Sequence, residues 1–185
     1  PAAKALWREI GAETASNPQI CLVTGNAGPV ARLHPSIKGV WGAQSSGASL
    51  VSFNLDAFNS YGHEQGDNAP VSEAAAFAYG TVLNRYLQKD SGHRIQIGDA
   101  STVFWADCSN MTFADEAEVF FAALLDPTSQ DERLEAAKIH SRLDAIRNGL
   151  RLSQVAPELA DGVRFHVLGL APNAARLSVR FYWQD

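Results

Sequence analysis

The sequence predicts a single α+β domain over residues 1–185, in which mixed or antiparallel strands combine with about three main helices. The chain is 46% hydrophobic and 19% charged, a composition typical of a globular protein with a real core. Some segments carry apolar residues at every second position, as strands do, and others carry them three or four positions apart, as helices do. The two patterns together indicate the α+β class.

The first half of the chain contains two segments with helical spacing. In residues 3–15, Leu6 and Ile10 lie four positions apart, which predicts a short helix. A longer helix is expected from Ser72, a natural N-cap, to about Lys89. Its buried stripe should consist of Ala76, Tyr79, Leu83 and Tyr86.

The second half predicts two further helices. Asp115 is expected to cap a helix that is rich in large apolar residues and ends at Asp126. Ser129 and Glu132 have the spacing of a capping box, which predicts a helix that continues to Asn148. Cations flank the apolar seam of this last helix, as they do around many buried helix faces.

Short β-branched or alternating runs predict the strands. The expected strands are residues 20–24, 30–34, 50–53, 94–97 and 102–105. Gly98 and Asp99 should form the turn between the last two of them.

The end of the chain has the pattern of a hairpin. Apolar and polar residues alternate in 163–167 and again in 175–183, and residues 171–174 carry the proline of a type I turn. One face of this hairpin is expected to be apolar. The other face would carry Arg164, His166, Arg176 and Arg180, more positive charge than solubility alone requires.

Composition excludes several classes of protein. The formal net charge of −5 argues against a free-standing nucleic-acid binder, because phosphate contacts normally demand a basic protein. No apolar stretch is long enough to span a membrane, and no signal segment opens the chain. Cys21 and Cys108 have no histidine cluster near them, so we expect two unpaired thiols, no metal site and no cofactor.

A hydrolase is a weaker hypothesis. Ser72 and His63 are close in sequence to Asp67 and Asp56, either of which could complete a catalytic triad with them. The strand-to-helix elbow that usually holds such a serine is absent, so we expect no catalytic residue.

Polar residues that bind without charge are concentrated in two neighbouring segments. The first is a Gly/Ser loop, residues 42–49, and the second is the stretch 52–73. Amides and hydroxyls there can contact phosphates and base edges, although such residues also cap their own backbone. The predicted binding residues, with nearby cations, are Lys38, Gln44, Ser45, Ser46, Asn54, Asn59, Asn68, Arg176 and Arg180.

Several motifs resemble one family in order along the chain. They are residues 32–40, 42–54, 60–62, 68–72, 94–99, 104–106 and 168–180. With these motifs, the chain resembles the large subunit of the type I-C CRISPR Cascade surveillance complex. That subunit is about three times longer, and this chain begins with Pro1 and has a single methionine. We therefore expect an interior segment of a larger subunit.

The resemblance implies a non-enzymatic role in an RNA-guided antiviral complex of the bacterial cytoplasm. It implies help with recognition of the short motif beside the DNA target, with R-loop opening and with recruitment of the helicase-nuclease. The implied partners are other Cascade subunits, CRISPR RNA and target DNA. The alternative is a scaffold segment that only docks neighbouring subunits.

Overall fold

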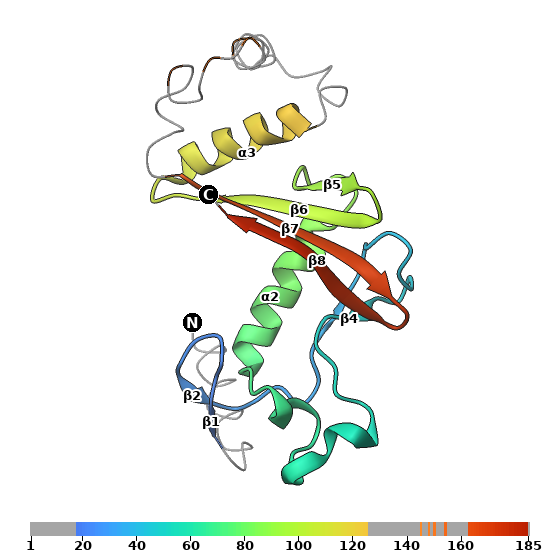
Figure 1. The fold of residues 1–185 in the computed structure, drawn as a ribbon. Coiled ribbons are helices and arrows are strands. Elements are labelled where there is room, and N and C mark those ends of the chain that lie inside the picture. Colours follow the sequence, from blue (N-terminus) through green and yellow to red (C-terminus); the bar gives the residue numbers. More distant parts are fainter. Residues whose placement is uncertain are drawn as a thin grey trace. The chain divides into compact units, whose positions relative to one another are not determined.

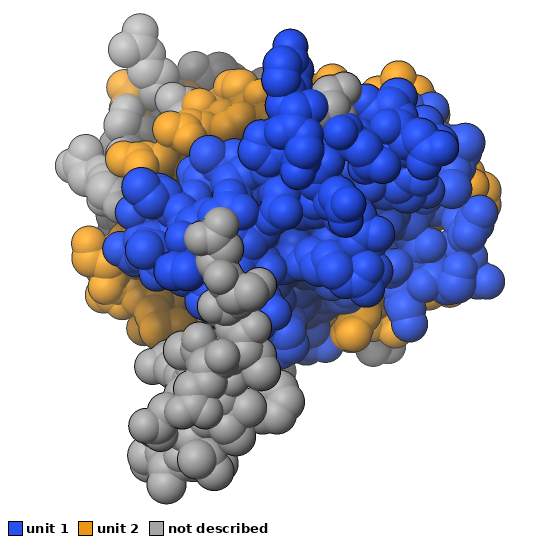
Figure 2. Space-filling view, turned by 90° about the horizontal axis from the view of Figure 1, so that it is seen from below, with its two compact units in different colours: residues 1–39, 43–85, 172–177 blue, residues 40–42, 86–171, 178–185 orange. Residues whose placement is uncertain are grey.

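A computed structural model describes residues 18–125 and 163–184, together with Ala145, Asn148, Leu150 and Gln154 (Figure 1). The chain folds into two compact units (Figure 2). Unit 1 consists of residues 1–39, 43–85 and 172–177, and unit 2 of residues 40–42, 86–171 and 178–185. Strands and two α-helices in the described part of the chain confirm the α+β class.

In unit 1, the first strand is shorter than predicted. β1 (Gln19–Ile20) pairs antiparallel with β2 (Ala27–Gly28), and the chain turns at residues 22–24. The prediction that residues 30–34 pair back as a strand was wrong, because their backbone groups bond elsewhere. The Ala31 N–H donates to the Val71 carbonyl at 2.9 Å, and the Arg32 carbonyl accepts from the Gly66 N–H at 3.2 Å.

Helix α2 (Glu73–Tyr86) begins where the sequence predicts. The Ser72 hydroxyl accepts a hydrogen bond from the Ala75 N–H at 3.3 Å, which confirms the N-cap. Ala76 and Leu83 of the expected stripe are buried, whereas Tyr79 and Tyr86 are half-buried. The helix ends three residues before Lys89.

A small hairpin follows the first strands. β3 (Ser36–Ile37) pairs antiparallel with β4 (Ala48–Ser49), and Ser49 lies beside Arg176 in parallel register. The predicted strand 50–53 was wrong: strand β4 lies just before it, and residues 50–53 form no strand. Phe53 packs instead against Phe58, with ring centroids 5.5 Å apart. Three short 3₁₀ segments follow: Asp56–Phe58, Ser60–Gly62 and Gln65–Asn68.

Unit 2 is built on a sheet with the order β5–β6–β7–β8. β5 (Arg94–Ile97) and β6 (Ala100–Asp107) form an antiparallel pair around the turn at 98–99, as predicted. β7 (Arg164–Asn173) pairs antiparallel with β6, and β8 (Arg176–Gln184) follows.

The tip of the β7–β8 hairpin lies farther along the chain than predicted. Ala171, Pro172 and Asn173 belong to β7, and Ala174 and Ala175 make the turn, with Ala174 in the left-handed region at φ 54°. Leu170 and Ala171 are fully buried. Burial of these two side chains stabilises a longer strand, which outweighs the turn preference of Pro172.

Helix α3 (Met111–Leu125) covers one face of this sheet (Figure 1). The predicted cap at Asp115 was wrong, because the Asn110 side-chain oxygen accepts from the Thr112 N–H at 3.0 Å and starts the helix earlier. The Phe121 ring packs on Phe104 and on Phe165, each with ring centroids 5.2 Å apart. The predicted helix 3–15 lies outside the described residues, and so does the predicted helix 129–148 except for Ala145 and Asn148.

The expected apolar face of the hairpin is only partly covered. Val167 and Leu177 are buried, and the Phe181 ring lies on Gly169, where an added Cβ would be 2.5 Å from it. Farther along β8, Val179 and Trp183 are 51% and 47% exposed. None of the helices among the described residues is long and apolar enough to cross a membrane.

Candidate nucleic-acid interface

The Gly/Ser loop forms the tip of the β3–β4 hairpin in unit 1. The side chains of Gln44, Ser45 and Ser46 are exposed there, and the Gly47 N–H donates to the Gln44 carbonyl at 2.9 Å. Gly47 has φ +99°, and a Cβ at this position would lie 2.9 Å from the Ser36 Cβ. The turn that presents the three polar side chains therefore requires glycine.

Lys38 lies beside this tip. A Cβ on Gly47 would be 3.1 Å from the Lys38 Cγ, so the lysine stem passes the loop, and its side chain is exposed. The Lys38 N–H donates to the Asn84 side-chain oxygen at 2.7 Å, and the Asn84 amide donates to the Ser36 carbonyl at 3.1 Å. Helix α2 thus fixes the base of the hairpin through Asn84.

Arg176 and Asn54 bind each other. The guanidinium donates to the Asn54 side-chain oxygen at 2.6 Å and lies 5.5 Å from the centroid of the Phe58 ring, a cation–π contact. Phe58 in turn contacts Phe53 edge-on. These contacts hold residues 53–58 against the start of β8, so Arg176 and Asn54 have a structural role whatever else they bind.

The remaining residues predicted in the loop differ in exposure. Asn59 is exposed, and its backbone N–H bonds the Asp56 carbonyl at 3.0 Å. Asn68 is half-buried and donates to the Gln65 carbonyl at 3.1 Å, which favours a role in holding the turn before α2. Sequence reasoning missed Tyr61, which is fully exposed in the left-handed region at φ 59°.

Arg180 belongs to unit 2, whereas Lys38 and Arg176 belong to unit 1. Its guanidinium forms an ion pair with Asp99 at 2.9 Å, and both side chains are largely exposed. Exposed pairs of this kind contribute little to stability.

Aromatic rings form a ladder across one face of the unit 2 sheet. Trp105 and His166 stack with centroids 4.9 Å apart and planes 9° apart, and His166 stacks on Tyr182 at 6.2 Å. The His166 Nδ1 lies 2.8 Å from the Tyr182 hydroxyl. The face predicted as cationic therefore also carries a cross-strand row of aromatic rings, which single-strand alternation did not reveal.

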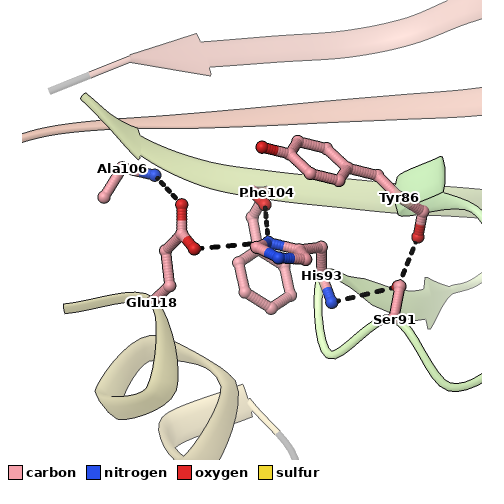
Figure 3. A network of polar contacts seen from close by, with 6 residues as sticks. All are labelled: Tyr86, Ser91, His93, Phe104, Ala106 and Glu118. Atoms are coloured by element: carbon pink, nitrogen blue, oxygen red, sulfur yellow. Dashed lines mark hydrogen bonds and ion pairs between the residues drawn. The ribbon is translucent and has the colours of Figure 1, made fainter. Parts of the chain in front are cut away.

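A polar network ties α3 to the sheet of unit 2 (Figure 3). The Glu118 carboxylate accepts from the Ala106 N–H at 2.8 Å, and its second oxygen lies 3.5 Å from the His93 Nδ1. The His93 ring stacks under Tyr86 with centroids 4.2 Å apart. Burial, and secondarily the Glu118 charge, raises the pKa of Tyr86. The network holds elements together and exposes no reactive group.

Cys21 lies at the N-terminal end of α2. Its sulfur accepts a hydrogen bond from the Ser72 N–H at 3.2 Å, and the side chain is buried. Hydrogen bonds from Ser72, and then from Thr24, lower the pKa of Cys21 to about 6 and outweigh the opposite effect of burial. Cys21 and Cys108 are both free thiols. In the described part of the chain, no three metal-binding side chains gather at one point.

A pocket of about 420 Å³ in unit 1 was not predicted. It lies between residues 31–35 and helix α2, and its lining includes Arg32, His34, Glu73 and Phe77. The His34 Nδ1 is 2.7 Å from the Tyr79 hydroxyl, whereas its Nε2 is buried without a hydrogen-bond partner. Burial lowers the pKa of His34, so its ring is neutral near pH 7.

The sequence was compared with models of known protein families. A family model described as CRISPR-associated protein (Cas_Csd1) matches residues 1–185, the whole chain. The chain is therefore a CRISPR-associated protein. It belongs to the Cas_Csd1 family, which confirms the resemblance seen in its motifs. No curated protein matches the chain.

Proposed function

We propose that the chain is a non-catalytic part of the large subunit of a type I-C Cascade complex and contacts target DNA. Its contact surface is the hairpin tip formed by Lys38, Gln44, Ser45 and Ser46. In such a complex, base pairing with the guide RNA reads most of the sequence, and the protein reads a short duplex motif and the backbone. The proposal includes three roles for the complex's large subunit: recognition of the motif beside the target, support of the R-loop and recruitment of the helicase-nuclease. It also places the protein in the cytoplasm.

The observation that supports it is the geometry of the tip. A turn with glycine at positive φ presents three uncharged polar side chains to solvent beside one exposed lysine, and Asn84 anchors the turn to a helix. Hydroxyls and backbone N–H groups contact phosphates, and lysine supplies the charge. A chain with net charge −5 can act in this way when the assembly supplies the remaining basic surface.

The test is target-DNA binding by the reconstituted complex. Lys38→Ala, and Ser45→Ala with Ser46→Ala, should each weaken binding by about 1–3 kcal/mol per good contact and leave the melting temperature unchanged. Lys89→Ala is the matched control, since Lys89 is also an exposed lysine. Full target affinity in the folded tip variants would reject the proposal.

A specific observation favours a second candidate, a scaffold that docks another subunit. Val179, Phe181 and Trp183 alternate along β8 and are 51%, 36% and 47% exposed. Exposed apolar residues gathered in this way often mark protein interfaces. If the scaffold function is the main one, Trp183→Ala should reduce recovery of the assembled complex, and the tip variants should have no effect on DNA binding.

A further inference from the structure

The pocket of unit 1 owes its shape to the way residues 29–35 lie along helix α2. The Glu73 N–H donates to the Pro29 carbonyl at 3.0 Å, and farther along Pro35 packs directly on Gly80. Small side chains, Ala31 and Ala76, are buried between these two attachments. Beside them lies a hollow of about 420 Å³ that is open to solvent.

The wall of this pocket presents apolar surface to solvent. Phe77 is 72% exposed and Leu33 is 62% exposed, although each lies next to the buried core of unit 1. An exposed ring beside a cavity is suited to stacking on a flat partner, because every nucleobase has an aromatic face.

Arg32 supplies the accessible hydrogen-bond donors of this pocket, whereas the His34 imidazole is bonded to Tyr79. Burial raises the pKa of Tyr79, which keeps its phenol protonated, so the phenol can donate to the His34 Nδ1 at 2.7 Å. The neutral imidazole then carries its hydrogen on Nε2, the buried atom that has no partner. Arg32 donates one N–H to the Gln65 side-chain oxygen at 2.7 Å, and this bond orients a guanidinium with four further N–H groups.

One acceptor complements these donors. The Glu73 side chain, in the first turn of α2, lines the pocket and carries a carboxylate, which accepts hydrogen bonds but donates none when ionised. The pocket therefore combines an aromatic wall, the guanidinium of Arg32 and one anionic acceptor.

We propose that this pocket binds the guanine base of an unpaired nucleotide. The inference rests on the proposed function, which brings an opened DNA duplex to this protein. Guanine presents two acceptors, O6 and N7, which the Arg32 guanidinium can contact with two of its N–H groups, and adjacent N1–H and N2–H donors suited to Glu73. Adenine presents an unprotonated N1 where the Glu73 carboxylate needs a donor, so the pocket discriminates between the two purines.

The experiment is saturation-transfer NMR on the assembled complex, titrated separately with GMP, AMP, CMP and dTMP. GMP should bind saturably and at least about 10-fold more tightly than AMP. Phe77→Ala and Glu73→Gln should each weaken GMP binding about 10-fold or more, and Glu73→Gln should also reduce the preference over AMP. Val82→Ala is the matched control, since Val82 is 47% exposed on the same helix and does not line the pocket.

Equal binding of all four nucleotides, or GMP binding that Phe77→Ala leaves intact, overturns the inference. A loss of complex assembly in Phe77→Ala without any nucleotide binding by the wild type overturns it too, and assigns the pocket to a partner protein. Lys38→Ala separates the two proposals. If that variant retains both full DNA affinity and GMP binding, the proposal that the hairpin tip contacts DNA is rejected, and the proposal that the pocket binds guanine is supported.

Discussion

Replacing Gly80 by alanine should destabilise unit 1, although the same change stabilises most helices. A Cβ at position 80 would meet the Pro35 ring, with the Pro35 Cβ only 3.0 Å away and the Cγ closer still. Carbon atoms pack best about 3.5–4.0 Å apart. A proline ring is part of the backbone and cannot rotate away, so residues 31–35 would have to shift.

Two opposing effects decide the size of the change. Alanine in place of glycine stabilises a helix interior by about 1 kcal/mol. Overpacking of a tight site costs about 1–3 kcal/mol. Because Gly80 is buried and Pro35 is held on both sides by the chain, we expect the second effect to be larger, with a net loss of up to about 2 kcal/mol.

Denaturant unfolding of the wild type and the variant measures this loss. Ala78→Gly, at an exposed position of the same helix, is the control and should cost about 1 kcal/mol through helix propensity alone. A more stable Gly80→Ala variant would refute the packing of Pro35 on α2. It would also remove the structural basis for the pocket, because Pro35 closes one end of it.

Three further predictions follow from named contacts. Glu118→Ala should lower the free energy of unfolding in denaturant by about 1–3 kcal/mol, because it leaves the Ala106 N–H without its acceptor. The control Glu116→Ala, at an exposed position of the same helix, should change this free energy little. Equal losses in the two variants would contradict a specific role for the Glu118 carboxylate. Asp99→Ala should cost less than about 1 kcal/mol, since its ion pair is exposed, and a larger drop in stability would show that the pair is part of the core. The pKa of Cys21, about 6 in the folded state against 9.0 for a free thiol, predicts stability that is greatest above pH 9 and declines toward pH 6. Melting temperatures measured over that range should therefore fall more with decreasing pH in the wild type than in Cys21→Ser; parallel curves would exclude this effect.

The sequence predicted the secondary structure correctly where capping residues or apolar spacing gave a strong local pattern. The Ser72 cap, the stripe of α2 and the β5–β6 pair all follow from spacing over a few residues, and the structure has them at those positions. The shape of the Gly/Ser loop was also indicated, because Gly47 occupies a position that other residues adopt with strain.

Predictions failed where distant contacts decide the local structure. We expected residues 30–34 to form a strand, yet the backbone groups of Ala31 and Arg32 bond residues 71 and 66, a contact that single-segment reasoning does not reveal. Asn110 caps α3 ahead of Asp115, and because both residue types cap helices well, propensity alone does not separate them. The pocket was missed because its lining comes from two segments about 40 residues apart in the sequence.

The division of the chain into units has a consequence for its synthesis. Residues 172–177, including Arg176, belong to unit 1, whereas the rest of that unit ends at residue 85. During translation, Asn54 and Phe58 therefore cannot contact Arg176 until about 120 more residues have been synthesised. Unit 1 cannot complete its native contacts on the ribosome before most of unit 2 has emerged, so the two units should acquire their final stability together rather than in sequence order.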